Sequence, residues 1–258
     1  MDLHLSGKTA LISGASKGIG RAAAQRLAAE GCNLVLVARG AGELDAARAA
    51  IVATANVKVE AVSNDLAVGG NVEALAARFT NIDILVNNAG AIPGGNLFDI
   101  DEARWRAAWD LKVFGYINMC RAFYPAMKAR RSGVIVNVLG TAAQGRDPQY
   151  ICGAVGNAAL TAFTQSLGSV SPKDGVRVLG VNPGLVATDR METLLRKRAQ
   201  DETGSADNWR SYIAPLPFGR AATAEEIAAA VAFLASDQSA YASGAIFTID
   251  GGAAARHA

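Results

Sequence analysis

The fold of this chain is decided near its N-terminus by the stretch Ala10-Leu11-Ile12-Ser13-Gly14-Ala15-Ser16-Lys17-Gly18-Ile19-Gly20-Arg21. A short apolar run leads directly into a turn with three glycines, and a helical pattern follows. The glycines allow a tight turn and a close approach of backbone to a ligand. The start of the helix offers unpaired N–H groups and a partial positive charge. The stretch therefore predicts a strand, a phosphate-binding turn and a helix, in that order.

Outward from this stretch, apolar runs alternate with helical patterns along all 258 residues. The alternation predicts an α/β fold in one domain over residues 1–258: a Rossmann-type, doubly wound parallel sheet of about seven strands with helices on both faces. The strands are expected at 8–13, 33–38, 57–62, 82–86, 133–139, 176–182 and 245–249. The helices are expected at 18–30, 43–55, 71–79, 102–129, 153–169 and 224–235.

A sheet of this kind binds its ligand beyond the carboxyl ends of the strands, so the turns that follow the strands should line one crevice. The irregular, charged segment 187–217 follows the sixth strand. We interpret it as a mobile lid over a substrate pocket, with a plain surface connection as the alternative. Its apolar and aromatic side chains suggest a small, fairly hydrophobic substrate; they are Leu194, Leu195, Trp209 and Tyr212.

Composition excludes several classes of function. The balance of 25 Lys and Arg against 23 Asp and Glu gives no electrostatic case for nucleic acid or an anionic membrane. No apolar run approaches the roughly 18–20 residues that span a bilayer. The odd number of cysteines and the acidic N-terminus without a signal-peptide pattern favour the cytoplasm. The two histidines, His4 and His257, lie at the termini, so we expect no metal site and no histidine-based triad.

Five segments, in this order, resemble the short-chain dehydrogenase/reductase family. They are residues 13–20, Asn64-Asp65-Leu66, Asn87-Asn88-Ala89-Gly90, residues 182–188 (Asn-Pro-Gly-Leu-Val-Ala-Thr) and residues 243–252. The resemblance covers nearly the whole chain. It implies an oxidoreductase with a nicotinamide cofactor, assembled as a homodimer or homotetramer through its long helices and last strand.

The resemblance also implies which residues bind the cofactor. Asp65 and Leu66 should lie near adenine, while backbone at Val186 and the Thr188 hydroxyl should hold the carboxamide. Asn87 has a competing role as a bridge between strands. The full implied set is Gly14, Ser16, Lys17, Gly18, Ile19, Gly20, Arg39, Asp65, Leu66, Asn88, Ala89, Gly90, Asn157, Pro183, Gly184, Val186 and Thr188.

Charge at the end of the second strand bears on cofactor preference. NAD-binding relatives of this fold usually place an acid there to bind the ribose hydroxyls, whereas this chain has Arg39, and its next acid is Glu43. A guanidinium suits a 2′-phosphate, and Lys17 adds a second cation. We therefore predict NADP(H) in preference to NAD(H), the alternative being that both are solvated surface cations.

The catalytic positions depart from the family. Its members carry a Ser, a Tyr and a Lys, with an Asn on the long helix. The tyrosine is the general acid/base, and the lysine lowers the pKa of that tyrosine. In this chain the corresponding positions hold Gly140, Gly153, Asn157 and Lys112.

Two residues are the best substitutes for the missing set. Lys112 supplies a positive charge or a proton if burial lowers its pKa, although a helix lysine pointing to water is equally compatible. Tyr150 precedes the tyrosine position by three residues and could swing into the pocket or simply pack in a loop. Asn157 can still bind a ribose hydroxyl. Asp147 and Cys152 are further candidates from the same loop, and the Tyr124–Lys128 spacing is interpreted as a decoy.

Three hypotheses follow. The first is an NADP(H)-dependent oxidoreductase that uses Lys112 and Tyr150 on a small alcohol or carbonyl substrate. The second is a cofactor-binding regulatory or structural protein without redox turnover. The third is a lyase, dehydratase or isomerase that reuses the pocket without net oxidation of the cofactor.

Overall fold

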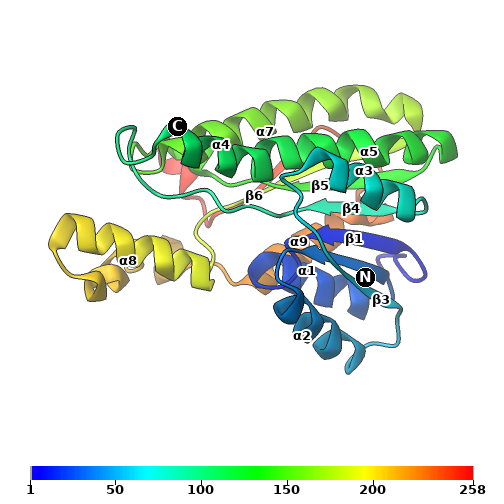
Figure 1. Ribbon diagram of the computed structural model, residues 1–258, viewed down its shortest axis with the longest axis horizontal. Coiled ribbons are helices and arrows are strands. Elements are labelled where there is room, and N and C mark those ends of the chain that lie inside the picture. The colour runs from blue at the N-terminus through cyan, green and yellow to red at the C-terminus, as the bar shows by residue number, and fades with distance from the viewer. Residues whose placement is uncertain (1, 258) are drawn as a thin grey trace.

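The computed structural model describes residues 2–257, and side chains as far as residue 255, so the His257 side chain lies outside the described residues. A seven-stranded sheet in the order β3-β2-β1-β4-β5-β6-β7 forms the centre, and every neighbouring pair is parallel (Figure 1). The strands are β1 Thr9–Ser13, β2 Asn33–Ala38, β3 Val59–Ser63, β4 Ile84–Asn87, β5 Gly133–Val138, β6 Val176–Pro183 and β7 Ile246–Ile249. The sheet and its order confirm the predicted doubly wound fold.

Helices cover both faces of this sheet (Figure 1). They are α1 Gly18–Ala29, α2 Ala41–Val52, α3 Gly69–Arg78, α4 Glu102–Trp109, α5 Gly115–Arg130, α6 Ala142–Gly145, α7 Ile151–Val170, α8 Asp189–Thr203 and α9 Ala224–Ala235. On one face α1 packs against α9 over a core that includes Ile12, Leu27 and Val231. On the other face, α5 contributes Met119 and Phe123 to the second core.

The predicted element boundaries hold with local shifts. Helix α7 begins at Ile151 rather than at residue 153, and α2 covers Ala41–Val52 rather than 43–55. The helix expected over 102–129 is interrupted by a π-helical segment, Asp110–Phe114, between α4 and α5. The π-helical segment contains Lys112, and π-turns inside α-helices often mark functional positions.

The segment 187–217 is not irregular as predicted, because most of it is the 15-residue helix α8 followed by the 3₁₀ segment Ala206–Tyr212. Salt bridges at i,i+4 spacing stabilise the exposed side of α8, for example Glu192 with Arg196. Leu195 and Trp209 are buried in a small core formed by this segment itself. They therefore support the segment's own fold instead of lining the crevice.

Three side-chain contacts connect α8 to loops of the main body. Leu194 lies close to the backbone of Gly94, in the loop after β4. Arg198 forms an ion pair of 3.1 Å with Asp147, in the loop after β5. Arg190 reaches the carbonyl of Ile92. The helix, which projects from the body at the left of Figure 1, thus faces the carboxyl ends of β4 and β5.

Candidate active site

The glycine turn after β1 has the backbone that close approach of a phosphate requires. Gly14 and Gly18 have left-handed φ angles of 67° and 55°, which L side chains rarely adopt. A Cβ at Gly20 would collide with the carbonyl of Gly14, so the first turn of α1 packs directly on the turn before it. A pyrophosphate is accommodated by this arrangement because backbone N–H groups at the start of α1 point outward from a side-chain-free surface.

The loop after β4 is fastened to the glycine turn. The Ser13 hydroxyl accepts hydrogen bonds from the backbone N–H groups of Asn88 (2.9 Å) and Ala89 (3.1 Å). The Asn88 amide donates to the carbonyls of Ser13 and Gly14. The Asn88 side chain therefore connects the loop after β4 to the glycine turn. Asn87 bridges β4 and β5 through a 2.9 Å bond from its amide to Asn137.

At the predicted 2′-phosphate position, one of the two cations, Lys17, is paired with an acid. The Lys17 ammonium lies 3.3 Å from Glu43, whose other carboxylate oxygen accepts a 3.5 Å bond from the Ser16 hydroxyl. Arg39 is exposed at the end of β2, and its backbone carbonyl accepts a bond from Ser63. Positive charge from Arg39 is thus available there, while Glu43 partly neutralises Lys17.

The remaining residues of the predicted cofactor set lie at or after the ends of β1, β3 and β6. Thr188 caps α8 by accepting a bond from Met191, and its methyl group would lie 3.3 Å from a Cβ at Gly18. The chain after β6 therefore passes directly beside the glycine turn. The Pro183 carbonyl accepts a hydrogen bond from the Thr141 N–H, and the Gly184 N–H donates to the Ile249 carbonyl. The Asp65 carboxylate accepts a hydrogen bond from the Ala67 N–H. The side chains of Val186 and Leu66 are buried, and that of Ile19 is half-buried.

Lys112 points into the protein. Its side chain passes Gly90, where a Cβ would lie 2.9 Å from the lysine Cδ, and the ammonium donates to the carbonyls of Val138 (3.4 Å) and Leu139 (3.2 Å). These carbonyls end β5 just before Gly140. Burial, followed by the nearby positive charge of Arg190, lowers the pKa of Lys112 from 10.5 to about 7. The amine is therefore able to gain or lose a proton near neutral pH.

Asn157 leaves a buried acceptor without a partner. Its side chain is 3% exposed, and within the described part of the chain its Oδ1 makes no hydrogen bond. A Cβ at Gly140 would lie 3.1 Å from the Asn157 amide nitrogen, so Asn157 faces the emptied serine position. Buried polar atoms are nearly always satisfied in native proteins. A hydroxyl donor such as that of a cofactor ribose fits this orphaned oxygen.

Tyr150 occupies the emptied tyrosine position. It precedes α7, and its ring fills the space beside Gly153, where an added Cβ would collide with Cε1 and Cζ of the ring. Its hydroxyl lies 3.5 Å from Nη2 of Arg190, at the start of α8. The structure thus brings Tyr150 and Arg190 together at the end of the crevice that holds Gly153.

Known proteins match this chain over nearly its full length. A family model described as enoyl-(acyl carrier protein) reductase matches residues 14–254. The 3-oxoacyl-(acyl-carrier-protein) reductase FabG of Escherichia coli is 32% identical over 253 residues, covering 97% of this chain and 98% of the relative. This chain belongs to the short-chain dehydrogenase/reductase family. It is an oxidoreductase of that type.

Two further members of the short-chain dehydrogenase/reductase family are similar to it. The oxidoreductase UcpA of Salmonella typhimurium is 34% identical, covering 96% of this chain and 95% of the relative. The crystal structure of L-sorbose reductase from Gluconobacter frateurii, complexed with NADPH and L-sorbose, superimposes with a TM-score of 0.89 at 32% identity. The match covers 97% of this chain and 98% of that one. Cofactor binding in that relative is consistent with the cradle found here.

The other residues that the sequence offered for catalysis are buried, lie outside this site or are bound to other residues. Cys152 is fully buried, and burial raises the pKa of its thiol, which disfavours a nucleophilic thiolate. Asp147 is paired with Arg198. Tyr124 and Lys128 both bind Asp174, far along α5 from the crevice. Within the described residues, no His, Cys, Asp and Glu side chains cluster in a way that would hold a metal ion.

Arg190 was missed by reasoning from sequence. A signal existed, because an arginine in the first turn of a helix opposes the helix dipole and calls for an explanation. The helix itself was not predicted, so the signal went unused.

Among the described residues, no helix combines the length and apolar character needed to cross a bilayer.

Proposed function

We propose that this protein is an NADP(H)-dependent oxidoreductase that interconverts a small alcohol and its carbonyl form, with Lys112 and Tyr150 in place of the family's catalytic set. One observation carries the proposal. Each side chain ends at a position where glycine has replaced the usual residue: Lys112 ends beside Gly140, and the Tyr150 ring lies over Gly153.

The cofactor would be held by the glycine turn, by Asn157 and by the turn from Pro183 to Thr188. When bound, it supplies or accepts the hydride. Asn157 offers its unpaired Oδ1 to a ribose hydroxyl. Thr188 keeps the start of α8 against the glycine turn, so the nicotinamide end of the crevice is bordered by the same helix that contacts Tyr150.

Lys112 is proposed as the proton donor in reduction and the proton acceptor in oxidation. A catalytic acid or base works best when its pKa lies near the working pH, and Lys112 meets that condition. Tyr150 is proposed to hydrogen-bond the reacting oxygen of the substrate through its hydroxyl. Arg190 holds the tyrosine ring toward the crevice.

We propose NADP(H) rather than NAD(H) because Arg39 stands exposed at the end of β2, where a 2′-phosphate would lie. Lys17 adds a second positive charge for the phosphate once its ion pair with Glu43 breaks. That pair is exposed, and exposed ion pairs contribute little to stability. Segment 187–217 is proposed as the lid, because its helix α8 bridges the loops after β4 and β5.

We also propose a homodimer or homotetramer. An apolar surface groove of about 420 Å³ lies along α4 and the π-helical segment, lined by Trp105, Trp109 and Phe114 among others. Phe114 is half exposed. Such a patch on the long helices would be covered by the same helices of a second copy.

The testing experiment has two steps. Purified protein is titrated with NADPH, NADP⁺, NADH and NAD⁺ by calorimetry. We expect NADPH and NADP⁺ to bind with micromolar affinity and more tightly than NADH and NAD⁺. Carbonyl-dependent oxidation of NADPH is then measured on a panel of ketones and aldehydes. Binding without oxidation would favour a cofactor-binding protein without redox turnover, and substrate conversion without net oxidation would favour a lyase or isomerase.

A further inference from the structure

The guanidinium of Arg190 is only partly used by the protein. It sits in the first turn of α8 and donates through Nη2 to the carbonyl of Ile92 and to the Tyr150 hydroxyl. Among the described residues, its Nε and Nη1 make no hydrogen bond. Three of its five N–H donors therefore have no protein acceptor.

The charge of Arg190 is also unbalanced. It forms no salt bridge within the described residues, and the helix dipole opposes a cation at this end of α8. Of the neighbouring acids, Asp147 pairs with Arg198 and Glu192 with Arg196, while Asp189 in the same turn forms no salt bridge within the described residues.

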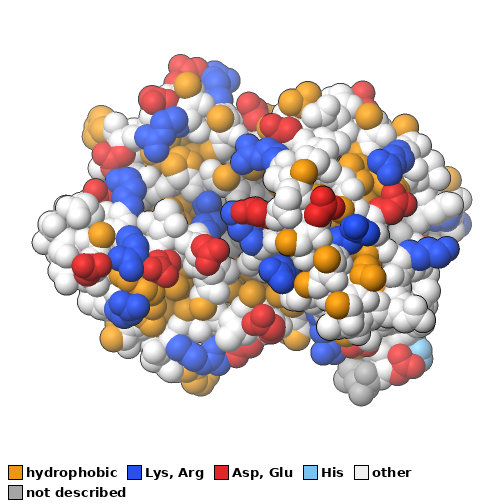
Figure 2. Space-filling view, turned by 60° about the horizontal axis from the view of Figure 1, so that its bottom comes forward, with side chains coloured by type: hydrophobic (Ala, Val, Ile, Leu, Met, Phe, Trp, Pro, Cys, Tyr) orange, Lys and Arg blue, Asp and Glu red, His pale blue; other side chains and the backbone are white. Residues whose placement is uncertain are grey.

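A hollow separates the α8 lobe from the body of the molecule, and side chains of both charges, Lys or Arg and Asp or Glu, lie along it (Figure 2). Arg190 is exposed at this end of the site, next to the Tyr150 hydroxyl. A guanidinium with free N–H groups binds carboxylates or phosphates in a bidentate manner.

We infer that the substrate carries a negatively charged group, a carboxylate or a phosphate ester, and that Arg190 binds it through its free N–H groups. The inference rests on the proposed oxidoreductase function and adds the chemical class of its substrate. Because Arg190 also contacts the Tyr150 hydroxyl, binding of the anion places the neighbouring carbonyl of the substrate close to Tyr150. Arg190 is thus a specificity residue of the same site.

The test uses pairs of carbonyl compounds that differ in charge. Acetoacetate is compared with methyl acetoacetate, and dihydroxyacetone phosphate with dihydroxyacetone, by measuring kcat/KM for NADPH oxidation. The first pair tests a carboxylate and the second a phosphate ester. We expect at least one anion to be preferred over its neutral partner by about 10- to 100-fold, the worth of a charged hydrogen bond.

Variants assign the preference to Arg190. Arg190→Leu should abolish the preference, because it should lower kcat/KM for the anion about 10- to 100-fold more than kcat/KM for the neutral partner. Arg190→Lys should retain part of it. Lys197→Leu is the matched control, since it removes one positive charge from an exposed ion pair on the same helix. Equal losses on both members of a pair, or no preference in the wild type, would overturn the inference.

The outcome is separable from failure of the proposed function. If the wild type oxidises NADPH with none of these compounds, binding of the same four compounds to the cofactor-loaded protein is followed by tryptophan fluorescence. Anion binding that Arg190→Leu abolishes would uphold the inference while removing the redox function. Absence of any Arg190-dependent binding would overturn the inference as well.

Discussion

The ring of Tyr150 fills the space beside Gly153 that any larger residue at that position would need. Tyr150 precedes Gly153 by three residues, nearly one helical turn, and so approaches the position from the N-terminal end of α7. The tyrosine ring can therefore lie there only because residue 153 is a glycine. This relationship makes the loss of the usual tyrosine compatible with a hydroxyl at the same end of the crevice.

Replacing Gly153 by alanine should displace Tyr150. The added Cβ collides with the ring, which must rotate away, while α7 gains a better helix former. We expect turnover to fall about tenfold, comparable to Tyr150→Phe and not additive with it. Gly145→Ala is the control, because a Cβ there meets nothing within 4 Å. Steady-state kinetics of the three variants check this, and wild-type turnover in Gly153→Ala would contradict the placement.

The pH dependence of turnover should report Lys112. Its pKa is lowered to about 7, so the amine is protonated below that pH and neutral above it. Reduction needs the protonated form and should slow as pH rises through about 7, while oxidation needs the neutral form and should quicken. Measuring kcat in both directions from pH 5.5 to 9 tests this. Lys112→Met should lose both the inflection and at least tenfold in rate, and an unchanged inflection would assign it to another group.

Charge at the end of β2 should set the cofactor preference. Arg39→Ala should weaken NADPH binding about tenfold and leave NADH unchanged, because a charged hydrogen bond to the 2′-phosphate is lost. Glu43→Gln should tighten NADPH, since it removes a negative charge and frees Lys17. Calorimetric titration of both variants measures these shifts. Equal effects on NADPH and NADH would show that the 2′-phosphate lies elsewhere.

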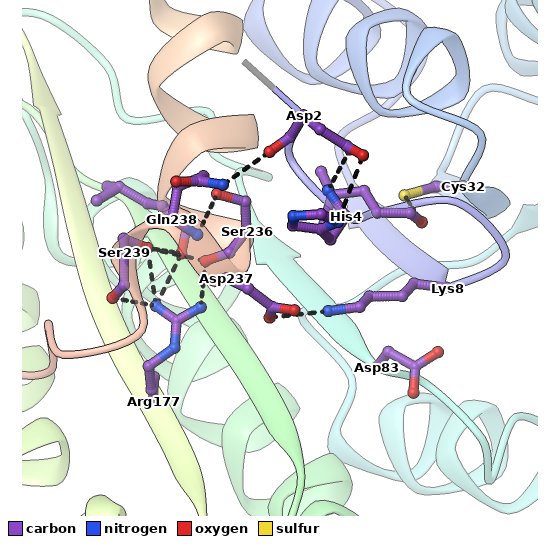
Figure 3. A network of polar contacts seen from close by, with 12 residues as sticks. Asp2, His4, Lys8, Cys32, Asp83, Arg177, Ser236, Asp237, Gln238 and Ser239 are labelled. Atoms are coloured by element: carbon purple, nitrogen blue, oxygen red, sulfur yellow. Dashed lines mark hydrogen bonds and ion pairs between the residues drawn. The ribbon is translucent and has the colours of Figure 1, made fainter.

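Arg177 should matter for stability and not for catalysis. At the amino ends of the strands, its guanidinium donates to the carbonyls of Leu234, Ser236 and Ser239 at the end of α9 (Figure 3). Arg177→Met leaves these carbonyls unpaired and should lower the free energy of unfolding by about 2–4 kcal/mol. Denaturant unfolding measures this, with NADPH affinity unchanged.

The control for that prediction lies in the same view. Lys8→Met breaks an exposed 3.1 Å pair with Asp237 and should cost less than about 1 kcal/mol (Figure 3). Similar losses in both variants would mean that the Arg177 hydrogen bonds contribute no more than a surface ion pair.

Assembly should depend on the groove along α4. Phe114→Glu places a charge on its apolar surface and should shift the protein from a dimer or tetramer to a smaller species in light scattering. Phe98→Glu, at a residue that is 93% exposed and outside the groove, is the control. A monomeric wild type, or a Phe114→Glu variant of unchanged mass, would refute the proposed interface.

Much of this architecture could be predicted from the sequence. The glycine turn and the alternation of apolar runs determine a parallel sheet, since strands buried on both faces read as continuous apolar segments. Helix α8 escaped prediction because its apolar stripe is narrow and its support comes from i,i+4 ion pairs, which read as a solvated, charged connection.

The site was less accessible to such reasoning. Lys112 and Tyr150 could be named because the resemblance marked the emptied positions, but the course of each side chain depends on distant backbone. The lysine fits only because Gly90 is small, and the tyrosine turns inward beside Gly153. Arg190 meets Tyr150 across 40 residues of sequence, a contact that no local pattern encodes.

The most direct test of the account is the initial rate of carbonyl-dependent NADPH oxidation, measured for the wild type and for the double variant Lys112→Met, Tyr150→Phe. The account predicts measurable oxidation by the wild type and a rate lower by about 100-fold or more in the double variant, with NADPH affinity unchanged. Equal rates in the two proteins, or tight NADPH binding without any oxidation by the wild type, would contradict it.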